Sequence, residues 1–595
     1  MKTQWFKQAG FLFSAAILVL SLVGWSSPQA AQAAVPEHAA IPPQDTLSPL
    51  LNIAAISAGY YHTCALTAGG GVKCWGANGN GELGDGTTNE HHTPVDVSGL
   101  ASGVSAIIAG GLHTCALTTG GGVKCWGNNY YGQLGDGTTT NRLTPVNVSG
   151  LASGVSTITT GYYHTCALTA GGGVKCWGYN GNGQLGDSTT TDRHSPVAVS
   201  GLASGASAIA AGWSHTCART TGGGVKCWGW NYYGQLGDDT TTDRYTPVDV
   251  SGLASGVSAI TAGYYHNCAR TSGGGIKCWG NNEYGQLGDG TITTRLTPVN
   301  VSGMASGASA IDAGADHTCA LTAGGGIKCW GNNFHGQLGD GTITEHHTPV
   351  SVSGLASGAS AIAAGGYHTC ALTSGGGVKC WGLNGNGQLG DSTNSDRHTP
   401  VDVVVATLTK SYRSAGSQDG WVLESSETSS TGGAMNSAAT VFYLGDDAGD
   451  RQYRAILSFN TSGLPDDAVI TKVKLKIKKQ GLVGSNPFTT HQGLLVDIKK
   501  PYFGTGLALA AHDFQASASK GAVGTFGTIP SSGWYSVTLL NTAYPYINKT
   551  RTTQLRLRFK LDDDNDNVAD YMKFFSGNYG TATERPVLVI QYYVP

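Results

Sequence analysis

The chain has 595 residues, of which 90 are glycine and 12% are charged, and its formal net charge at pH 7 is -3. This length admits several domains, and many glycines with few charges are typical of a turn-rich β protein. Nucleic-acid binding is excluded as an expected role, because it requires a basic stripe that this composition does not supply.

The N-terminus has the pattern of a secretory signal peptide. Two early lysines precede an apolar core at residues 11–23, and Ala31-Gln32-Ala33 forms a cleavage site of small residues. A retained membrane anchor is the alternative, which the shortness of the apolar run disfavours, and no later stretch is long and apolar enough to span a bilayer. We expect a signal peptide over residues 1–33, a linker over 34–52, and a mature protein without a transmembrane segment that is secreted or displayed at the cell surface.

Seven near-identical blocks fill residues 53–405, and each carries the same two cysteines. The first cysteine of each block lies 51 residues after that of the previous block, and the pairs account for all 14 cysteines. A fixed period of this length is typical of a solenoid, a propeller or an array. The pairs are Cys64 with Cys74, Cys115 with Cys125, Cys166 with Cys176, Cys217 with Cys227, Cys268 with Cys278, Cys319 with Cys329, and Cys370 with Cys380.

The third block illustrates the pairing that we expect. It reads as four short strands, at residues 156–160, 164–168, 174–178 and 195–199, with turn signals between them and no helical periodicity. If the glycine turn after the second strand closes a hairpin, the two cysteines of a block lie opposite each other with their Cα atoms about 4.5–5.5 Å apart. A disulfide accepts this separation.

We therefore predict seven cross-strand disulfides, one in each block. Each closes a short loop, so each adds less than the roughly 3 kcal/mol estimated for a 15-residue loop. Exported proteins keep their disulfides. A zinc site is disfavoured, because the cysteines do not have C-x-x-C spacing.

The blocks resemble a known repeat family. The string from Gly161 to Thr169 (GYYHTCALT), then Trp177-Gly178, then Gly183-Gln184-Leu185-Gly186-Asp187, is similar to the regulator of chromosome condensation repeat, whose pattern is G-x-x-H-T-x-A-L-T, W-G-x-N and G-Q-L-G. The match recurs in all seven blocks, with departures such as Asn267 and Arg270. The resemblance implies a seven-bladed β-propeller, which agrees with seven units of four strands.

The resemblance implies less about activity. The founding nuclear member of the family is an exchange factor for a small GTPase and binds chromatin. This chain departs from it through its predicted signal peptide, its cysteines and its lack of a basic surface. Secreted bacterial members, one of which binds an enzyme through one face of its propeller, are the better comparison. Function must still be argued from the site.

A histidine, a lysine and a tryptophan occur at fixed positions in every block. A ring of seven histidines invites a metal or catalytic hypothesis, but a metal site needs a few converging ligands rather than a symmetric ring. We therefore interpret these positions as parts of blade construction, with the histidines as hydrogen-bonding anchors. The histidines are His62, His113, His164, His215, His266, His317 and His368, and the lysines are Lys73, Lys124, Lys175, Lys226, Lys277, Lys328 and Lys379.

Variable positions concentrate in the first and third connections of each block, which emerge at one rim of an up-and-down blade. The glycine turns and the Ser-Gly-Leu/Met-Ala-Ser-Gly connections scarcely vary and belong to the opposite rim. Because Tyr, Trp and Arg are enriched at binding hot spots, we predict a partner-binding rim, with drift on exposed loops as the alternative. The predicted rim residues are Tyr60, Tyr61, Tyr130, Tyr131, Tyr162, Tyr163, Trp213, Trp230, Tyr232, Tyr233, Tyr264, Tyr265, Phe334 and His335.

A third variable set lies just before the Thr-Pro or Ser-Pro step of each block and can reach the same rim. It contains Arg142, Arg193, Arg244, Arg295 and Arg397, with His91 and His346 in the remaining two blocks.

The repeat ends near residue 406, and residues 406–595 read as a second β domain without cysteine, a β-sandwich of jelly-roll type. Residues 470–477 alternate apolar side chains with lysines, as a half-buried strand does. Similar strands are expected at 454–459, 534–540, 553–559 and 587–593.

The stretch 454–465 and the closing stretch 585–592 resemble secreted β-sandwich modules of the carbohydrate-binding type known as DNRLRE domains, although the eponymous motif is absent. The resemblance implies attachment to a glycan or a cell surface. Asp562, Asp564 and Asp566 form a candidate calcium site. Because the run lacks the Gly and Glu of an EF-hand loop, a solvated acidic turn is the favoured interpretation.

The sequence contains no phosphate-binding G-x-x-x-x-G-K, no H-E-x-x-H and no G-x-S-x-G. We therefore expect a binding or scaffold protein rather than an enzyme, with no cofactor apart from the candidate calcium. The expected partner is an extracellular protein or glycan. The alternatives are an adhesion protein that contacts sugar through both domains, and a hydrolase or lyase that uses the histidine-rich rim.

Overall fold

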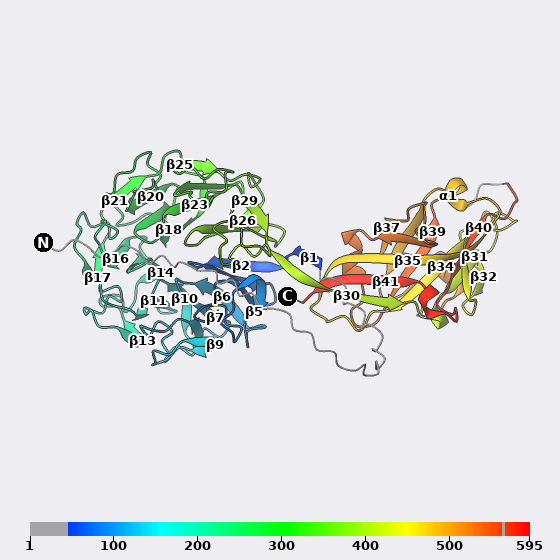
Figure 1. Ribbon diagram of the computed structural model, residues 1–595, viewed down its shortest axis with the longest axis horizontal. Coiled ribbons are helices and arrows are strands. Elements are labelled where there is room, and N and C mark those ends of the chain that lie inside the picture. Colours follow the sequence, from blue (N-terminus) through cyan, green and yellow to red (C-terminus); the bar gives the residue numbers. More distant parts are fainter. Residues whose placement is uncertain (1–45, 562–565, 595) are drawn as a thin grey trace, which may run out of the picture. The chain divides into compact units, whose positions relative to one another are not determined.

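The computed structural model describes residues 46–561 and 566–594. This part of the chain is almost entirely β, with seven separate four-stranded antiparallel sheets followed by a curled sheet of 13 strands (Figure 1). The predicted fold class, a seven-bladed β-propeller followed by a sandwich-like β region, is confirmed. None of the helices in the described ranges has the length and apolar character needed to cross a bilayer. The predicted signal peptide, residues 1–33, lies outside the described residues.

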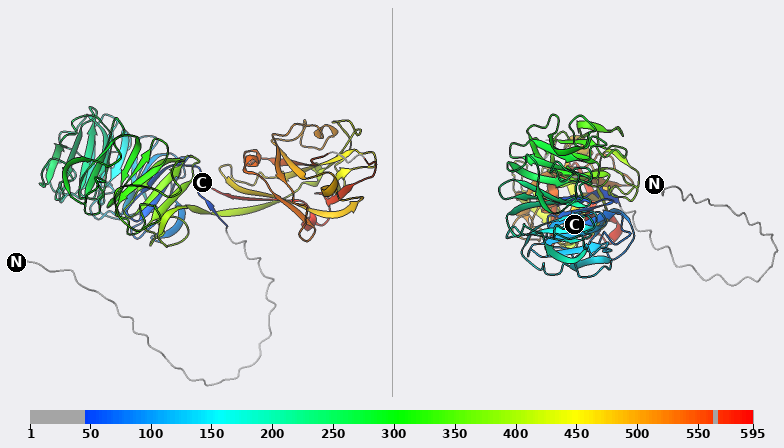
Figure 2. Two further views of the ribbon diagram at one scale, coloured as in Figure 1. Left: turned by 90° about the horizontal axis from the view of Figure 1, so that it is seen from above. Right: turned by 90° about the vertical axis from the view of Figure 1, so that its left-hand side faces the viewer.

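Each blade is built from four consecutive strands (Figure 2). The first strands of neighbouring blades contact one another, so the first strand is the innermost. In chain order the blades comprise β2 (Ile53–Ala58), β3 (His62–Thr67), β4 (Val72–Gly76), β5 (His91–Asp96); β6 (Val104–Ala109), β7 (His113–Thr118), β8 (Val123–Gly127), β9 (Arg142–Asn147); β10 (Val155–Thr160), β11 (His164–Thr169), β12 (Val174–Gly178), β13 (Arg193–Ala198); β14 (Ala206–Ala211), β15 (His215–Thr220), β16 (Val225–Gly229), β17 (Arg244–Asp249); β18 (Val257–Ala262), β19 (His266–Thr271), β20 (Ile276–Gly280), β21 (Arg295–Asn300); β22 (Ala308–Ala313), β23 (His317–Thr322), β24 (Ile327–Gly331), β25 (His346–Ser351); and β26 (Ala359–Ala364), β27 (His368–Thr373), β28 (Val378–Gly382), β29 (Arg397–Asp402).

The second and third strands of each blade form the hairpin that carries the disulfide. In the third blade Cys166 lies opposite Cys176 and Leu168 lies opposite Val174, as predicted. All seven predicted pairs are joined, and the two Cα atoms of each pair are 4.1 Å apart, slightly closer than expected. The cysteine spacing therefore predicted the register of the hairpin correctly. The disulfides join Cys64 to Cys74, Cys115 to Cys125, Cys166 to Cys176, Cys217 to Cys227, Cys268 to Cys278, Cys319 to Cys329, and Cys370 to Cys380.

Neighbouring blades pack through a tryptophan and a loop. The tryptophan after the second cysteine is fully buried in every blade, and Trp126 of blade 2 shares one apolar cluster with Cys64 and Cys74 of blade 1. The Gly-Glu-Leu-Gly loop of blade 1, which reads Gly-Gln-Leu-Gly in the other blades, covers the same tryptophan. A Cβ atom on Gly84 of this loop would lie 2.6 Å from Trp126 Nε1, so this position requires glycine.

Blades 7 and 1 are joined by the same contacts as the other neighbouring blades. Among the described strands, neither of these two blades contributes a strand to the sheet of the other. Blade 7 uses only residues 359–402, and blade 1 only residues 53–96. Trp75 Nε1 donates to the Gln388 carbonyl oxygen at 2.9 Å, and every equivalent tryptophan bonds the blade before it in the same way. In addition, β1 (Thr46–Pro49) pairs antiparallel with the first residues of the strand that follows blade 7.

The strands after blade 7 form the curled sheet, in the order β1-β30-β41-β35-β40-β33-β34-β39-β36-β37, with β31, β32 and β38 paired beside this path. Short helical turns interrupt them, among them α1 (Pro487–Thr490). The strands are β30 (Val404–Arg413), β31 (Gly420–Glu424), β32 (Gly432–Asn436), β33 (Val441–Asp446), β34 (Gln452–Asn460), β35 (Val469–Val483), β36 (Leu494–Lys499), β37 (Lys520–Thr525), β38 (Trp534–Thr538), β39 (Thr552–Phe559), β40 (Tyr571–Phe575) and β41 (Val587–Tyr593).

Strand β35 shows how the curled sheet obtains its core. Val473, Leu475 and Ile477 are fully buried, whereas the intervening lysines keep contact with solvent. The buried residues join side chains from β33, β34, β36, β39, β40 and β41 in one apolar cluster. The predicted half-buried strand and the four other predicted strands of this region are therefore confirmed.

Burial of the cysteines leads to a prediction about reduction. All 14 cysteines are at most 2% exposed, and thiol–disulfide exchange requires access of a thiolate to sulfur. We expect the seven disulfides to resist a thiol reductant in native buffer and to react only when urea unfolds the blades. Mass-spectrometric alkylation mapping under both conditions checks this, and rapid reduction in native buffer would contradict the buried hairpin.

Candidate functional site

The first and third connections of the blades lie together at one rim of the propeller. Tyr131, in the third connection of blade 2, packs against Tyr163, in the first connection of blade 3, with ring centroids 5.0 Å apart. Tyr233 and Tyr265 repeat this contact between blades 4 and 5 at 5.4 Å. Each blade thus places its third connection beside the first connection of the next blade.

Aromatic residues close the propeller axis at this rim. Tyr162 stacks on Trp213 at 4.7 Å, and Tyr60 stacks on Tyr264 at 5.1 Å. The equivalent positions in the other three blades are Gly111, Ala315 and Gly366, which leave room for these rings. A cavity of about 90 Å³ lies among these residues and the ends of the innermost strands.

Around these axial rings, most of the predicted rim residues form one connected set of ring contacts. Twelve of the fourteen, in blades 1 to 5, are linked by ring-to-ring contacts. His335 reaches this set through Tyr367, whereas Phe334 contacts Tyr284. Tyr179, Tyr284 and Tyr367 are not among the predicted binding residues, but they occupy the same variable positions and contact the rim rings.

Three of the predicted rim side chains are largely open to solvent. Tyr130 is 72% exposed, Tyr232 66% and Phe334 58%. Two isoleucines of the long third connections, Ile292 and Ile343, are also more than half exposed. This rim therefore presents large apolar side chains that the fold itself does not bury.

A cavity of about 370 Å³ opens on this rim. Its lining comes from blades 2 to 5 and is uncharged: six aromatic side chains, one serine and one asparagine. The lining residues are Tyr131, Tyr163, Tyr179, Asn182, Trp213, Ser214, Trp230 and Tyr265.

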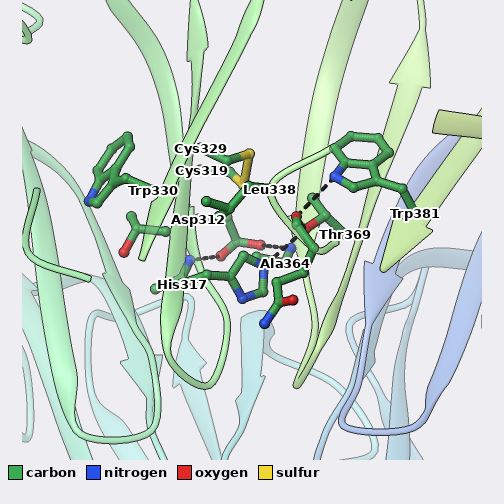
Figure 3. Close-up of a disulfide and its surroundings, with 12 residues drawn as sticks. Asp312, His317, Cys319, Cys329, Trp330, Leu338, Ala364, Thr369 and Trp381 are labelled. Atoms are coloured by element: carbon green, nitrogen blue, oxygen red, sulfur yellow. Dashed lines mark hydrogen bonds between the residues drawn. A yellow bond between two sulfur atoms is a disulfide. The ribbon is translucent and has the colours of Figure 1, made fainter. Parts of the chain in front are cut away.

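The seven fixed histidines do not form a rim site. Each is buried. In six of them Nε2 bonds the threonine hydroxyl that follows the histidine of the next blade, as His317 bonds Thr369 at 2.9 Å (Figure 3); His215 bonds Asn267 instead. His368 bonds Thr63 in the same way and completes the circle. The predicted hydrogen-bonding anchor is thus present, but it joins two blades rather than closing one sheet. The full set is His62–Thr114, His113–Thr165, His164–Thr216, His215–Asn267, His266–Thr318, His317–Thr369 and His368–Thr63.

The threonine hydroxyl fixes the tautomer of the histidine. Thr369 Oγ1 donates its proton to the Gln337 carbonyl oxygen at 2.8 Å, so it can only accept from His317 Nε2. In blade 5 Asn267 performs both roles, since its Oδ1 accepts from His215 and its Nδ2 donates to the Gln235 carbonyl oxygen. Each histidine therefore carries a proton on Nε2.

Burial keeps these histidines neutral. It lowers the pKa of His62 and His215 to about 4 and the pKa of the other five to about 3. Among the described residues, Nδ1 of six of the seven has no hydrogen-bond partner. A second proton on the ring would therefore remain unsatisfied in a buried position.

The arginines of the third variable set are structural as well. Arg142 Nη2 pairs with Asp136 of its own loop at 2.7 Å. Burial raises the pKa of Asp136, but hydrogen bonds from Thr138 and Arg142 outweigh it and hold the pKa below its usual value. Sequence reasoning missed this role, although a basic residue six positions after the loop aspartate was its signal. The seven pairs are Asp85–His91, Asp136–Arg142, Asp187–Arg193, Asp238–Arg244, Asp289–Arg295, Asp340–His346 and Asp391–Arg397.

Five of the fixed lysines make cross-strand contacts within a blade. Lys73, Lys226 and Lys379 pair with aspartates on the fourth strand at 2.6–2.8 Å, and Lys124 and Lys277 bond asparagines there at 2.8 Å. These five lysines thus contribute to blade construction.

The candidate calcium site lies largely outside the described residues, which exclude Asp562 and Asp564. Asp566 is described, and its Oδ1 accepts from the Val568 backbone amide at 2.7 Å. Within residues 46–561 and 566–594 no three His, Cys, Asp or Glu side chains are arranged to hold a metal ion. The calcium site stays a prediction.

Comparison with known proteins identifies the family. Residues 9–257 match the RCC1-like domain, and residues 257–286, 308–337 and 359–388 match the regulator of chromosome condensation (RCC1) repeat. The chain is 33% identical over 363 residues to the ultraviolet-B receptor UVR8 of Arabidopsis thaliana, covering 60% of this chain and 82% of the receptor. It is 31% identical over 313 residues to the mitochondrial RCC1 domain-containing protein RUG3 of the same plant, covering 50% of this chain and 70% of that protein.

Among solved structures, Prp20p of Saccharomyces cerevisiae superposes with a TM-score of 0.50 at 23% identity, over 59% of this chain and 87% of that one, which is a likeness of fold. The fold and the matches together define a seven-bladed propeller of the RCC1-like class. The chain belongs to the family of RCC1 repeat proteins.

The contact between blades leads to a prediction for Thr369→Val, which keeps the shape of the side chain but removes the hydroxyl. His317 Nε2 then loses its acceptor, and an unsatisfied buried group costs about 1–3 kcal/mol. We expect a lower urea midpoint. Thr369→Asn is the matched control, because Asn267 already makes both bonds in blade 5, and it should recover most of the loss. Equal losses for the two variants would contradict the double role of the hydroxyl.

The histidines also predict how stability depends on pH. Their folded pKa values of about 3 to 4 lie below the ordinary histidine value of 6.5, so the unfolded chain binds more protons between these limits. Stability is complete above pH 6.5 and falls as the pH drops toward 4. In the propeller Asp312 and Asp316, whose pKa values burial raises, act in the opposite sense, but seven histidines outweigh two carboxyls. Urea midpoints that are equal or higher at pH 5 than at pH 7.5 would disprove this.

Proposed function

We propose that this chain is a secreted or surface-displayed binding protein whose aromatic rim captures a protein partner. The observation that carries the proposal is the exposure of Tyr130, Tyr232 and Phe334 on the variable rim, where each side chain is more than half open to solvent. Exposed aromatic side chains on a rigid scaffold supply contact area at low entropic cost. The rim loops of blades 2 to 4 are each braced by an ion pair between an arginine and the aspartate of the same loop.

The family supports a protein partner. The structure of Prp20p was reported together with its binding properties to Gsp1p and histones, so an RCC1-type propeller serves as a protein-binding platform there. Export is supported by the seven disulfides, which persist in oxidising compartments. For the C-terminal region we propose attachment to a surface or glycan, which rests on its resemblance to carbohydrate-binding β-sandwich modules.

The test is capture of the partner from the native cell surface with matched variants. Tyr130→Ala, Tyr232→Ala and Phe334→Ala together remove the exposed rim side chains, and we expect the captured protein to be lost at unchanged thermal midpoint. Thr119→Glu, on an exposed glycine-turn connection of the opposite rim, is the control and should retain it. Retention by the triple variant would refute the proposal.

A glycan array separates the protein partner from the sugar-binding alternative. We expect no glycan signal that depends on the propeller rim. Strong sugar binding that Trp230→Ala and Tyr232→Ala abolish would replace the protein partner with a carbohydrate.

A further inference from the structure

The uncharged cavity on the rim of blades 2 to 5 has a specific origin in the sequence. Ser214 occupies a position that holds tyrosine in blades 1, 3, 5 and 7, and this small, buried residue leaves space between Tyr163 and Tyr265. On blade 3 the side chain of Tyr179 lies over Gly181, where an added Cβ atom would be 2.6 Å from Tyr179 Cζ. Three residues around the cavity, Tyr179, Ser214 and Trp230, occur at these positions in no other copy.

Aromatic rings from four blades surround this space. Trp213 stacks on Tyr265 with centroids 5.5 Å apart, and Trp230 meets Tyr265 edge-on at 5.0 Å. Across the cavity Tyr131 contacts Tyr179 at 4.8 Å. These contacts hold the walls in place before any ligand binds.

Carboxylates stand beside two of these walls. Asp192 accepts from the Asn180 backbone amide, next to Tyr179, at 2.8 Å. Burial is the main cause that raises the pKa of Tyr179 and of Tyr131; the Asp192 charge adds to the pKa of Tyr179 and, after the neighbouring tyrosines, to that of Tyr131. Asp316 contributes to the pKa of Tyr265, which burial chiefly raises to about 12. Asp316 is the only carboxylate among the seven residues that precede the fixed histidines. The aromatic cavity therefore lies in a negative field.

The arginines of the adjoining loops are not available to neutralise this field. Arg142, Arg193 and Arg244 are held by the aspartates of their own loops at 2.7–2.8 Å. His194, the other titratable group before the Ser-Pro step of blade 3, is exposed. These arginines would therefore not compete with a cation of the partner for Asp192 and Asp316.

Three ligand chemistries fit an aromatic cavity: a sugar ring, an apolar side chain and a cation. An apolar group gains from burial but nothing from the two carboxylates, and a sugar gains from stacking and, from the carboxylates, only where its hydroxyls reach them directly. A cation over aromatic faces gains about 0.5–2 kcal/mol, depending on desolvation, and gains further from the flanking charges. A guanidinium also stacks flat on aromatic rings, which an ammonium does not. The volume of about 370 Å³ lies within the range of small-ligand sites.

We propose that this cavity receives an arginine side chain of the protein partner, held between the aromatic walls and steered by Asp192 and Asp316. The inference rests on the proposed function of the rim and names the chemistry that the partner must present. The partner therefore carries an exposed basic segment, and its association weakens as salt screens the field.

The experiment uses the full chain and two short peptides that differ in one group, acetyl-Gly-Arg-Gly-amide and its citrulline analogue, followed by saturation-transfer NMR. Citrulline keeps the shape of arginine but has no charge. We expect the arginine peptide to bind about tenfold more tightly, which corresponds to about 1.4 kcal/mol, and to lose affinity as salt increases. Equal binding of the two peptides would overturn the proposal.

Other blades of the chain show which substitutions the fold tolerates at the cavity. Trp230→Ala should abolish peptide binding, and the fold tolerates it because blade 1 has Ala77 at the same place. Asp192→Asn should weaken binding several-fold without unfolding the loop, because in blade 2 Asn141 accepts the bond that Asp192 accepts in blade 3, each at 2.8 Å. Thr119→Ala, on the opposite rim and outside the cavity, is the control and should bind as the parent does.

The remaining outcomes distinguish the cation site from a sugar site and from failure of the proposed function. A neutral oligosaccharide that competes for the cavity and is lost with Trp230→Ala would replace the cation with a sugar. Failure of the arginine peptide to bind, while partner capture still depends on Tyr130, Tyr232 and Phe334, would overturn the cation site and leave the proposed function intact. Capture that ignores those rim side chains would overturn the proposed function itself.

Discussion

The propeller depends on a hydrogen-bonding side chain that lies between each pair of neighbouring blades. A threonine, or in blade 5 an asparagine, donates to the loop carbonyl of the preceding blade and accepts from the histidine of that blade. Among the described strands none is exchanged to close the ring, and each disulfide joins only the two halves of one hairpin. The ring therefore depends on these buried bonds, together with the tryptophan and glycine packing beside them. This explains why the histidine, the tryptophan and the loop glycines are the same in every copy.

The contacts between blades do not involve most of the rim residues, so these residues can vary. Because the contacts between blades use positions on the strands and in the Gly-Gln-Leu-Gly loop, the residues before the histidine and after the Trp-Gly step can change without opening the ring. The pairing of Arg244 with Asp238 braces the loop that presents the exposed ring of Tyr232, and bracing of this kind lowers the entropic cost of binding. At the axis, however, variation is limited. Large rings such as Tyr60 need small residues such as Gly366 beside them, because a Cβ atom on Gly366 would lie 2.5 Å from Tyr60 Cδ2.

Much of this fold follows from the sequence, and the remainder has a physical reason for being hidden. The period predicted the number of blades, and the spacing of Cys166 and Cys176 predicted the hairpin register, since both depend on contacts close in sequence. The partner of His62 is 52 residues away, in the next blade, and a pattern within one block does not reveal it. The ion pairs of the rim arginines were overlooked because their positions vary between histidine and arginine. The rim cavity arises from side chains of four blades and becomes visible only in three dimensions.

Nitrogen-15 NMR of the histidine rings tests the connection between blades most directly, because long-range couplings report which ring nitrogen carries the proton. Seven histidines should hold their proton on Nε2 and remain neutral at pH 5, well below the ordinary pKa of 6.5. If these seven rings instead titrate near pH 6.5, or carry the proton on Nδ1, the threonine hydroxyl does not join the blades as described.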